Sequence, residues 1–278
     1  MRKLAATVLL CLLLLGGSWA QTKGIATFGG LKNLEFINQY YDGGTGSMGS
    51  GPGKNLQLGF TSNSQVIISA AKGGSGNFIN NPGGYPVMFF ATGTGVVVNV
   101  KASVSTGVWF TYSALQPGTA TIYDSADGKG NVIGSTNLTP NNSGCTGYKM
   151  CVWTPIAFPL TTPVASIRFS GTANMLAIGA IHLGVKIPTF TGLTSSKNPS
   201  GQGEPVTFAA AVSATGTAPV GTVRFKVGNQ VAGEVAVNAG TASITLSTVP
   251  VGSTQITAIF RGVGFVTSTA KVIQTVNP

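Results

Sequence analysis

Apolar and polar residues alternate along much of the chain, which is the pattern of half-buried β-strands. The alternation is clearest in residues 107–135, where GVWFTYS and TATIYD both follow a two-residue repeat. Segments rich in glycine and proline separate these predicted strands, at residues 116–118 and 127–130. Because proline presets φ and glycine tolerates positive φ, both segments predict tight turns. The pattern therefore indicates an antiparallel β core.

Short apolar segments with turn signals between them recur on both sides of this stretch: LQLGFTS, QVIISA, VMFFAT, VVVNV, CVWTPIAF, SIRFSG and LAIGAIHLGV. Their spacing predicts a β-sandwich or barrel rather than alternating strands and helices. Residues 31–41, LKNLEFINQYY, are ambiguous. The spacing of Leu31, Leu34 and Ile37 fits one or two helical turns, but an extended segment fits the β-rich context nearly as well.

A change of composition after residues 186–188 suggests a linker, because proline lacks the N–H that a central strand needs. Beyond it, one face of a predicted strand carries four apolar residues, Val206, Phe208, Ala210 and Val212. Further strands are predicted in GTVRFKV, GTASITL, TQITAIF and STAKVIQTV. We expect two β-sandwich domains, residues 21–187 and 188–278.

The first 20 residues have the three parts of a secretory signal peptide. Arg2 and Lys3 precede an apolar run at residues 4–15, and GGSWA follows it. The run is too short to span a bilayer comfortably, and no later apolar run is long enough to act as a transmembrane anchor. We expect cleavage near Ala20 and a protein that is secreted, extracellular or held at the cell surface.

The charge distribution argues against a specific nucleic-acid partner. The chain carries 16 Lys and Arg against 6 Asp and Glu, but the basic residues are scattered singly rather than gathered in a stripe. Only 8% of residues are charged, so hydroxyl and amide groups must supply most of the polar surface. Extracellular polysaccharide or other surface proteins are the expected partners. The oligomeric state stays open.

Cys145 and Cys151 are the two cysteines that follow the leader. An even number of cysteines in an exported protein predicts a disulfide. Closing so short a loop stabilises the fold by about 2 to 3 kcal/mol on the entropic model. A metal site at these cysteines lacks further ligands, because the chain has one histidine and no second cysteine pair.

The residues that catalysis needs are scarce, and we expect no enzyme activity. A glycosidase requires two carboxylates across a cleft. Of the six acidic residues, Asp124 and Asp127 are close in sequence, but they flank a predicted hairpin turn, where aspartate bonds nearby backbone amides. His182 occurs in a strand pattern without a G-x-S-x-G motif, so a hydrolase triad is not predicted.

No cofactor is expected, with calcium as the alternative. Asp124 and Asp127, helped by Asn131, could supply oxygen ligands, although the spacing matches no EF-hand. Glu35 and Asp42 give a second calcium hypothesis, at the domain edge. The simpler interpretation is that Asp124 and Asp127 stabilise a turn, and that Glu35 and Asp42 are a cap and a solvated loop acid.

Aromatic residues are the better candidates for ligand contact. Sugars place their C–H faces on aromatic rings while their hydroxyls bond amides. Four aromatic residues lie in turns or opposite an apolar face: Trp109, Tyr148, Trp153 and Tyr85. Trp109 is the first choice, because Val108, Phe110 and Tyr112 occupy the other face of its strand. The alternative for each ring is simple packing against the protein.

Seven motifs occur in an order that resembles a known module: LEFINQYYDGG, NLQLGFTSN, GNFINNPGGYPVMFF, GVWFTYSA, ATIYDSADGKGNVIGS, CTGYKMCVW and SIRFSGTAN. Together they resemble the N-terminal β-sandwich module of secreted bacterial proteins related to PEP-CTERM exosortase substrates. The resemblance covers residues 25 to about 186. It implies a jelly-roll-like sandwich of the galactose-binding or lectin-like kind.

Residues 188–278 resemble the bacterial Ig-like repeat of large surface and exported proteins. The resemblance rests on TSSKNPSGQGEPVTFAAAV, GTVRFKVG and GTASITLSTVPVGSTQITAIFRG, with Val263 at a turn position where an acidic residue is usual. It implies a spacer or adhesive unit. The sequence thus favours an exported, non-enzymatic cell-surface or extracellular-matrix protein with an adhesive or structural Ig-like module. The alternative is a glycan-binding, lectin-like module, with its dependence on calcium left open.

Overall fold

A computed structural model describes residues 24–84, 86–105 and 107–278 of the chain. The predicted signal peptide, residues 1–20, and the candidate Tyr85 lie outside these ranges. Within them, the regular structure consists of β-strands and two single 3-10 turns, η1 (Ala70–Lys72) and η2 (Ala126–Gly128). The predicted all-β class is confirmed.

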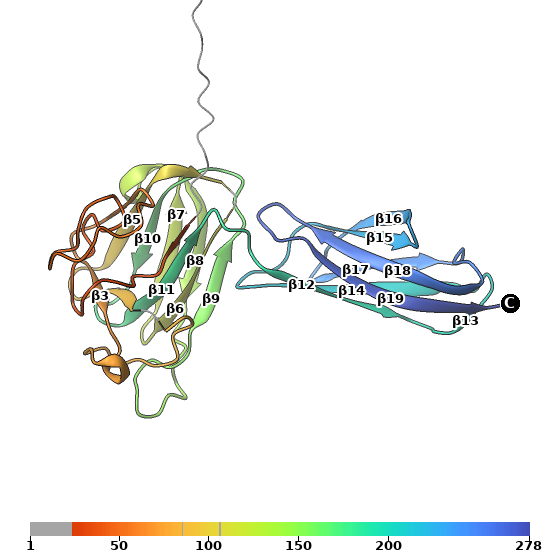
Figure 1. Ribbon diagram of the computed structural model, residues 1–278, viewed down its shortest axis with the longest axis horizontal. Helices are drawn as coiled ribbons and strands as arrows, with labels where there is room; N and C mark the ends of the chain where they lie inside the picture. Colours follow the sequence, from red (N-terminus) through yellow and green to blue (C-terminus); the bar gives the residue numbers. More distant parts are fainter. Residues whose placement is uncertain (1–23, 85, 106) are drawn as a thin grey trace, which may run out of the picture.

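Two antiparallel sheets form the N-terminal sandwich (Figure 1). The first sheet has the order β3, β4, β11, β6, β9, with β1 also pairing β11; its strands are β1 (Gly24–Ala26), β3 (Ser64–Ile67), β4 (Val87–Phe90), β6 (Val108–Ala114), β9 (Thr154–Phe158) and β11 (Leu176–Leu183). The second has the order β2, β5, β10, β7, β8; its strands are β2 (Leu58–Phe60), β5 (Gly95–Val104), β7 (Gly118–Tyr123), β8 (Val132–Leu138) and β10 (Val164–Ser170).

Apolar residues from both sheets form the core between them. Phe110 of β6 meets Phe169 of β10 edge to face, with ring centroids 4.9 Å apart. The predicted alternation in β6 is confirmed, because Val108, Phe110 and Tyr112 are buried in this core while Trp109 lies on the opposite face. The outer face of the first sheet is therefore available for other contacts.

The two predicted turns connect different kinds of strand pairs. The turn at residues 116–118 carries the chain from β6 in the first sheet to β7 in the second. The turn at residues 124–131 joins β7 to β8 as an antiparallel hairpin, with Ile122 opposite Gly134. The chain thus passes from one sheet to the other at the first predicted turn and reverses within one sheet at the second.

A second sandwich follows, with one sheet of three strands and one of five. The first contains β12 (Thr189–Ser195), β14 (Val206–Ala214) and β17 (Thr241–Leu246); the second contains β13 (Ser200–Gly201), β15 (Thr222–Val227), β16 (Gln230–Ala236), β18 (Gly252–Arg261) and β19 (Ser268–Asn277). The apolar face predicted for β14 is buried, together with Phe225 and Phe260 of the facing sheet. Among the described residues this domain has no disulfide, so side-chain packing stabilises it.

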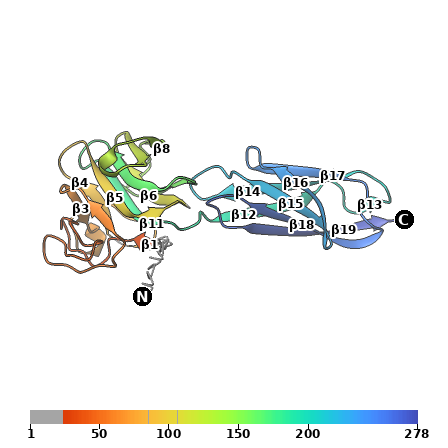
Figure 2. The ribbon, with the colours of Figure 1, turned by 90° about the horizontal axis from the view of Figure 1, so that it is seen from above.

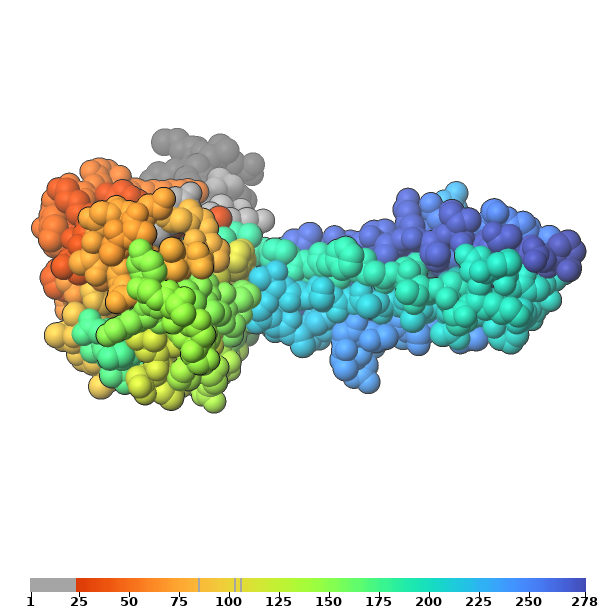
Figure 3. Space-filling view, turned by 90° about the horizontal axis from the view of Figure 1, so that it is seen from below, coloured from red at the N-terminus to blue at the C-terminus, as the bar shows by residue number. Residues whose placement is uncertain are grey.

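The two sandwiches lie end to end (Figures 2 and 3). Ile187, in the predicted linker, is fully buried and belongs to the C-terminal core. Its N–H donates to Gly264 and its carbonyl accepts from Val266. Ala157 of β9 donates from its backbone N–H to the carbonyl oxygen of Gly216, at 3.1 Å. The chain between the sandwiches is thus packed and hydrogen-bonded.

Candidate functional site

A long segment without regular structure, residues 27–57, joins β1 to β2. The helical interpretation of residues 31–41 is wrong: this stretch forms turns and one isolated bridge between Phe36 and Gln65. The β-rich surroundings prevail over the helix-like spacing because its apolar residues pack down onto the sandwich core. Ordered loops of this length in compact domains often carry function.

Glu35 organises this segment from the inside. Its side chain is fully buried and accepts three backbone hydrogen bonds, from Lys32 at 2.7 Å, Met48 at 2.8 Å and Ser50 at 3.1 Å. Burial is the largest single influence and raises the pKa of Glu35, but the hydrogen bonds from Ser50, Lys32 and Met48 together lower it below 4.5. The charged carboxylate therefore ties the glycine-rich stretch, at Met48 and Ser50, to Lys32 near the start of the segment.

Packing around Glu35 leaves no room for a side chain at Gly46, where an added Cβ would lie 2.4 Å from the carboxylate oxygen. Nearby, the backbone N–H of Phe28 donates to the hydroxyl of Tyr41 at 2.7 Å. Burial raises the pKa of Tyr41 to about 12, so its phenol stays protonated at neutral pH. The segment is built as a rigid part of the domain.

The outer side of this segment forms a concave surface with β2 and β5 that we call the loop hollow. It encloses about 800 Å³ and is lined by Asn38, Gln39, Asp42, Gly44, Thr45, Gly46, Ser47, Gly59, Phe60, Ser62 and Lys101. Amide and hydroxyl groups dominate the lining. The volume is within the range of about 300 to 1,000 Å³ that is usual for small-molecule sites.

Two exposed amides in the loop hollow are free to bind a ligand. Within the described residues, the side chains of Asn38 and Gln39 make no hydrogen bond. Asp42 pairs with Lys101, so the two charges in the lining compensate each other. Phe60 is half-buried and contributes part of an aromatic ring. Together these groups can bond an uncharged, hydroxyl-rich molecule.

Trp109 lies on the outer face of the first sheet and stacks on His182, with ring centroids 3.3 Å apart and an interplanar angle of 12°. It also packs against the C-terminal core. Burial lowers the pKa of His182 to about 4, so the imidazole is neutral near pH 7. The predicted glycan stacking on Trp109 stays a prediction, and one ring face is already covered by His182.

The predicted disulfide between Cys145 and Cys151 is confirmed. Trp153, just after it, packs edge to face on Phe78 with centroids 5.7 Å apart and donates from Nε1 to the Ile79 carbonyl at 2.9 Å. Tyr148 is half-exposed within the disulfide loop. Ligand stacking by Tyr148 and Trp153 stays a prediction, although Trp153 already has an evident packing role.

The proposed calcium ligands are only partly brought together. Asp124 accepts hydrogen bonds from the backbone and side chain of Asn131, both at 2.8 Å. These bonds from Asn131 lower the pKa of the Asp124 carboxyl below its ordinary value. Asp127 instead bonds the side chain of Asn99, at 2.8 Å. The contacts are those of a stabilised turn, and calcium binding here stays a prediction.

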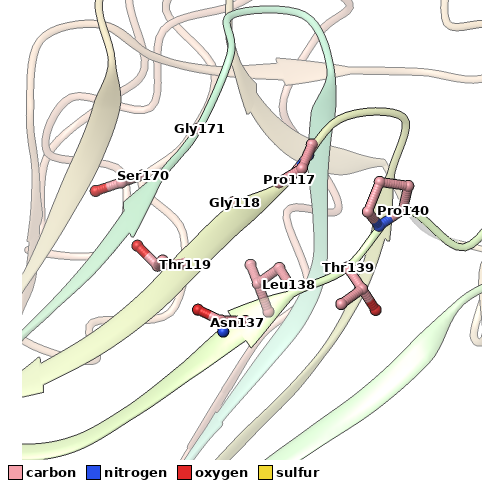
Figure 4. Close-up of a pocket in the computed structure, with 9 residues that line it drawn as sticks. All are labelled: Pro117, Gly118, Thr119, Asn137, Leu138, Thr139, Pro140, Ser170 and Gly171. Carbon is pink, nitrogen blue, oxygen red and sulfur yellow. The ribbon is translucent and has the colours of Figure 1, made fainter.

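Another concave surface lies at the ends of β7, β8 and β10, with a volume of about 480 Å³ (Figure 4). Thr119, Asn137 and Ser170 stand beside one another across the three strands, at paired positions of the sheet. Pro117 and Pro140 line the loop side. The lining offers one amide and three hydroxyls, those of Thr119, Thr139 and Ser170, and it contains no titratable side chain.

The loop hollow was missed by sequence analysis. Asn38 and Gln39 stand in an ambiguous segment, and Lys101 approaches them from a distant strand. The positive φ of Asn38, 46°, is a turn conformation that asparagine adopts readily. The run of asparagine, glutamine and glycine at residues 38–46 was the one available signal of a polar, turn-rich surface.

Comparison with known proteins supports the C-terminal assignment. Residues 193–277 match the family model of the bacterial Ig-like domain, group 3. No curated protein matches the sequence. The match confirms the Ig-like part of the resemblance. The relation of residues 25–186 to exosortase-related modules stays a prediction.

Comparison with solved structures finds matches of low similarity. The carbohydrate-binding module of Cellvibrio mixtus lichenase 5A, solved with cellotriose, is 17% identical over 44% of this chain and 86% of its own, with a TM-score of 0.26. A structure of the fibronectin(III)-like modules of Clostridium thermocellum CbhA is 17% identical over 32% of this chain and 99% of its own, with a TM-score of 0.24. The Endo-D glycoside hydrolase domain Spr0440 of Streptococcus pneumoniae is 10% identical over 91% of this chain and 43% of its own, with a TM-score of 0.32.

Among the described residues, no helix has the length and apolar composition needed to cross a membrane. The same ranges contain no group of three or more His, Cys, Asp or Glu side chains placed to hold a metal ion.

Proposed function

We propose that this chain is an exported, non-catalytic protein of the cell surface or extracellular matrix. Its N-terminal sandwich binds extracellular glycan at the loop hollow. Its Ig-like domain acts as a spacer that holds the loop hollow away from the surface to which the protein is attached. The observation that carries the proposal is a rigid loop that presents the free amides of Asn38 and Gln39 beside the ring of Phe60.

The chemistry of the hollow matches a sugar better than a charged ligand. Each amide can donate to one hydroxyl and accept from another, which is how proteins bond polyhydroxyl rings. The half-buried ring of Phe60 offers an apolar surface to C–H groups. Because Asp42 and Lys101 neutralise each other, neither an acidic nor a basic ligand is favoured.

A non-catalytic role is supported by the contacts of the acidic residues, all six of which serve the structure. Glu35 ties the loop, and the other five bond neighbouring side chains: Asp42 with Lys101, Asp124 with Asn131, Asp127 with Asn99, Glu204 with Lys197, and Glu234 with Arg224. No pair of carboxylates faces a common cleft in the described residues. The usual two-carboxylate mechanism of glycoside hydrolysis needs such a pair.

The export proposal rests on the leader-like pattern of residues 1–20 and on the disulfide, since disulfides persist in oxidising compartments. Expression with the native leader in a bacterial host, followed by N-terminal sequencing, tests it. A mature protein that starts near Gln21 in the exported fraction supports the proposal. An uncleaved protein that stays in the cytoplasm contradicts it.

Affinity electrophoresis through gels that contain single soluble polysaccharides locates the binding surface. We expect at least one polysaccharide to retard the wild-type chain and to leave an Asn38→Gly, Gln39→Ala double variant unretarded. Glycine suits the positive φ at residue 38. Gln116→Ala, an exposed amide elsewhere in the same sandwich, is the matched control and should behave as wild type. Equal retardation of all three proteins would place binding outside the loop hollow.

A further inference from the structure

The outer face of the first sheet carries a further cavity, which shares no lining residue with the loop hollow. Three neighbouring strands build it. Ile25 of β1 is opposite His182 of β11, and His182 is opposite Trp109 of β6. Because their strand neighbours Ala26, Ile181 and Phe110 are buried in the core, these three side chains stand together on the outer face.

The stacked rings of Trp109 and His182 leave two polar atoms without partners. Both the indole Nε1 and the imidazole Nδ1 are buried, and neither makes a hydrogen bond within the described residues. Trp153 differs, because its indole N–H is satisfied by a backbone carbonyl. Buried polar groups in folded proteins are nearly always paired, so two adjacent exceptions require an explanation.

A cavity of about 320 Å³ adjoins both rings, and its lining also includes Ile25, Thr27, Pro82 and Ala180. The lining is mainly apolar and contains no charged side chain. A few polar groups in an apolar cavity of this size are typical of sites for small ligands.

The two unpaired nitrogens restrict the chemistry of what can bind. An indole N–H only donates. The imidazole is neutral near pH 7, because burial lowers the pKa of His182 to about 4, so Nδ1 accepts when the proton is on Nε2. A carboxylate cannot donate to Nδ1, and an ammonium cannot accept from the indole. A hydroxyl does both with one oxygen atom.

We propose that this cavity binds a hydroxyl-bearing ligand, a sugar ring or a small polyol, through a hydroxyl that accepts from Trp109 Nε1 and donates to His182 Nδ1. The apolar residues Ile25, Pro82 and Ala180 pack against the carbon skeleton. This site goes beyond the proposed function, because it is separate from the loop hollow. It also gives Trp109 a role through its ring edge rather than its face.

Titration of the full ¹⁵N-labelled chain tests the proposal through the indole N–H resonances of Trp109 and Trp153. The probes are D-glucose, D-galactose, N-acetyl-D-glucosamine and glycerol, with tetrahydropyran as a ring without hydroxyls. We expect a saturable shift of the Trp109 resonance with at least one hydroxylated probe and none with tetrahydropyran. A response to glycerol identifies a polyol site, and a response to sugars alone identifies a sugar site.

Two variants separate binding from folding. His182→Leu removes the acceptor and Trp109→Phe removes the donor; by the loss of one hydrogen bond, each should weaken binding about tenfold. Binding to Trp109→Phe is followed through the ¹³C-labelled methyl groups of Ile25 and Ala180. An unmoved Trp153 resonance in both variants shows that the sandwich is intact.

A cavity that holds only water would give no saturable shift with any probe, and that result would overturn the proposal. Unchanged affinity in a folded His182→Leu variant would also overturn it. The Asn38→Gly, Gln39→Ala double variant should keep the Trp109 shift. Failure of glycan binding at the loop hollow can therefore be distinguished from failure of this site.

Discussion

At the scale of single residues, one carboxylate decides whether the loop hollow exists. Glu35 is buried, and its oxygens accept backbone N–H groups from Lys32 and from Met48 and Ser50 of the glycine-rich stretch. Hydrogen bonds to a charged acceptor are worth about 1.5 to 3 kcal/mol each, and a buried donor without its acceptor is costly. The shape of the surface proposed to bind glycan therefore depends on a buried residue that does not line it.

Replacement of Glu35 by glutamine should destabilise the chain by about 2 kcal/mol, because one oxygen acceptor becomes an NH₂ group facing backbone donors. The lowered pKa of Glu35 adds a pH dependence. Its contribution to stability is complete above pH 4.5 and is lost as the pH falls through the lowered pKa. Urea unfolding at several pH values measures both effects.

In Glu35→Gln the acid-dependent loss of stability should be smaller than in wild type. Asp127→Asn, which alters an exposed turn carboxyl, is the control for a general effect of removing one negative charge. If Glu35→Gln and wild type show the same stability between pH 3 and pH 7, the account of the loop is wrong.

At the scale of elements, strands were predictable from sequence and loops were not. The faces of β6 and β14 follow from alternation because the side-chain period of a strand is two residues. The contacts of residues 27–57 do not follow, because Glu35 meets Met48 and Ser50 through tertiary packing that has no period. Trp109 was correctly placed on the outer face, but its partner His182 belongs to a strand far along the chain.

The disulfide loop illustrates a second contact that sequence could not show. Asn142 is nearly buried, and its Oδ1 accepts from the backbone N–H groups of Cys151 at 2.8 Å and Val152 at 2.9 Å. Its Nδ2 donates to Ser113 of β6 at 2.8 Å. The number and spacing of the cysteines predicted the disulfide. Nothing in the sequence indicated that Asn142 attaches the disulfide loop to the sheet.

Asn142→Ala should cost about 2 kcal/mol, since it leaves two partly buried backbone donors and the buried Ser113 hydroxyl without their partner. Hydrogen exchange at Cys151 and Val152 should accelerate, which mass spectrometry of peptides from residues 139–153 measures. Ser143→Ala, at an exposed position of the same loop, should exchange like wild type. Equal protection in Asn142→Ala and wild type would contradict the attachment.

At the scale of the whole molecule, the junction determines how the two sandwiches are held. Trp109 and Ala157 of the first sandwich contact the core of the second, and Ile187 is buried within it. Gly216 approaches β9 closely: an added Cβ would lie 2.8 Å from the carbonyl carbon of Pro155. Interdomain contacts of this kind limit relative motion when they are packed.

Gly216→Ala should loosen the junction. Alanine costs about 1 to 2 kcal/mol at a positive φ and would also push against β9. Gly203→Ala is the matched control, with a similar φ of 75° and no atom within 4 Å of the added Cβ. Small-angle X-ray scattering should show a broader distribution of shapes for Gly216→Ala alone. Identical scattering from both variants would contradict a packed junction.

The N-terminal sandwich should bind glycan at the loop hollow without calcium, because Asp42, the one carboxylate in the lining, is paired with Lys101. A glycan-array screen of the full chain, with calcium and with a chelator, is the decisive measurement. We expect the same specific signals in both conditions, absent from the Asn38→Gly, Gln39→Ala variant and retained by Gln116→Ala. No signal in either condition, or signals that survive in the double variant, would contradict it.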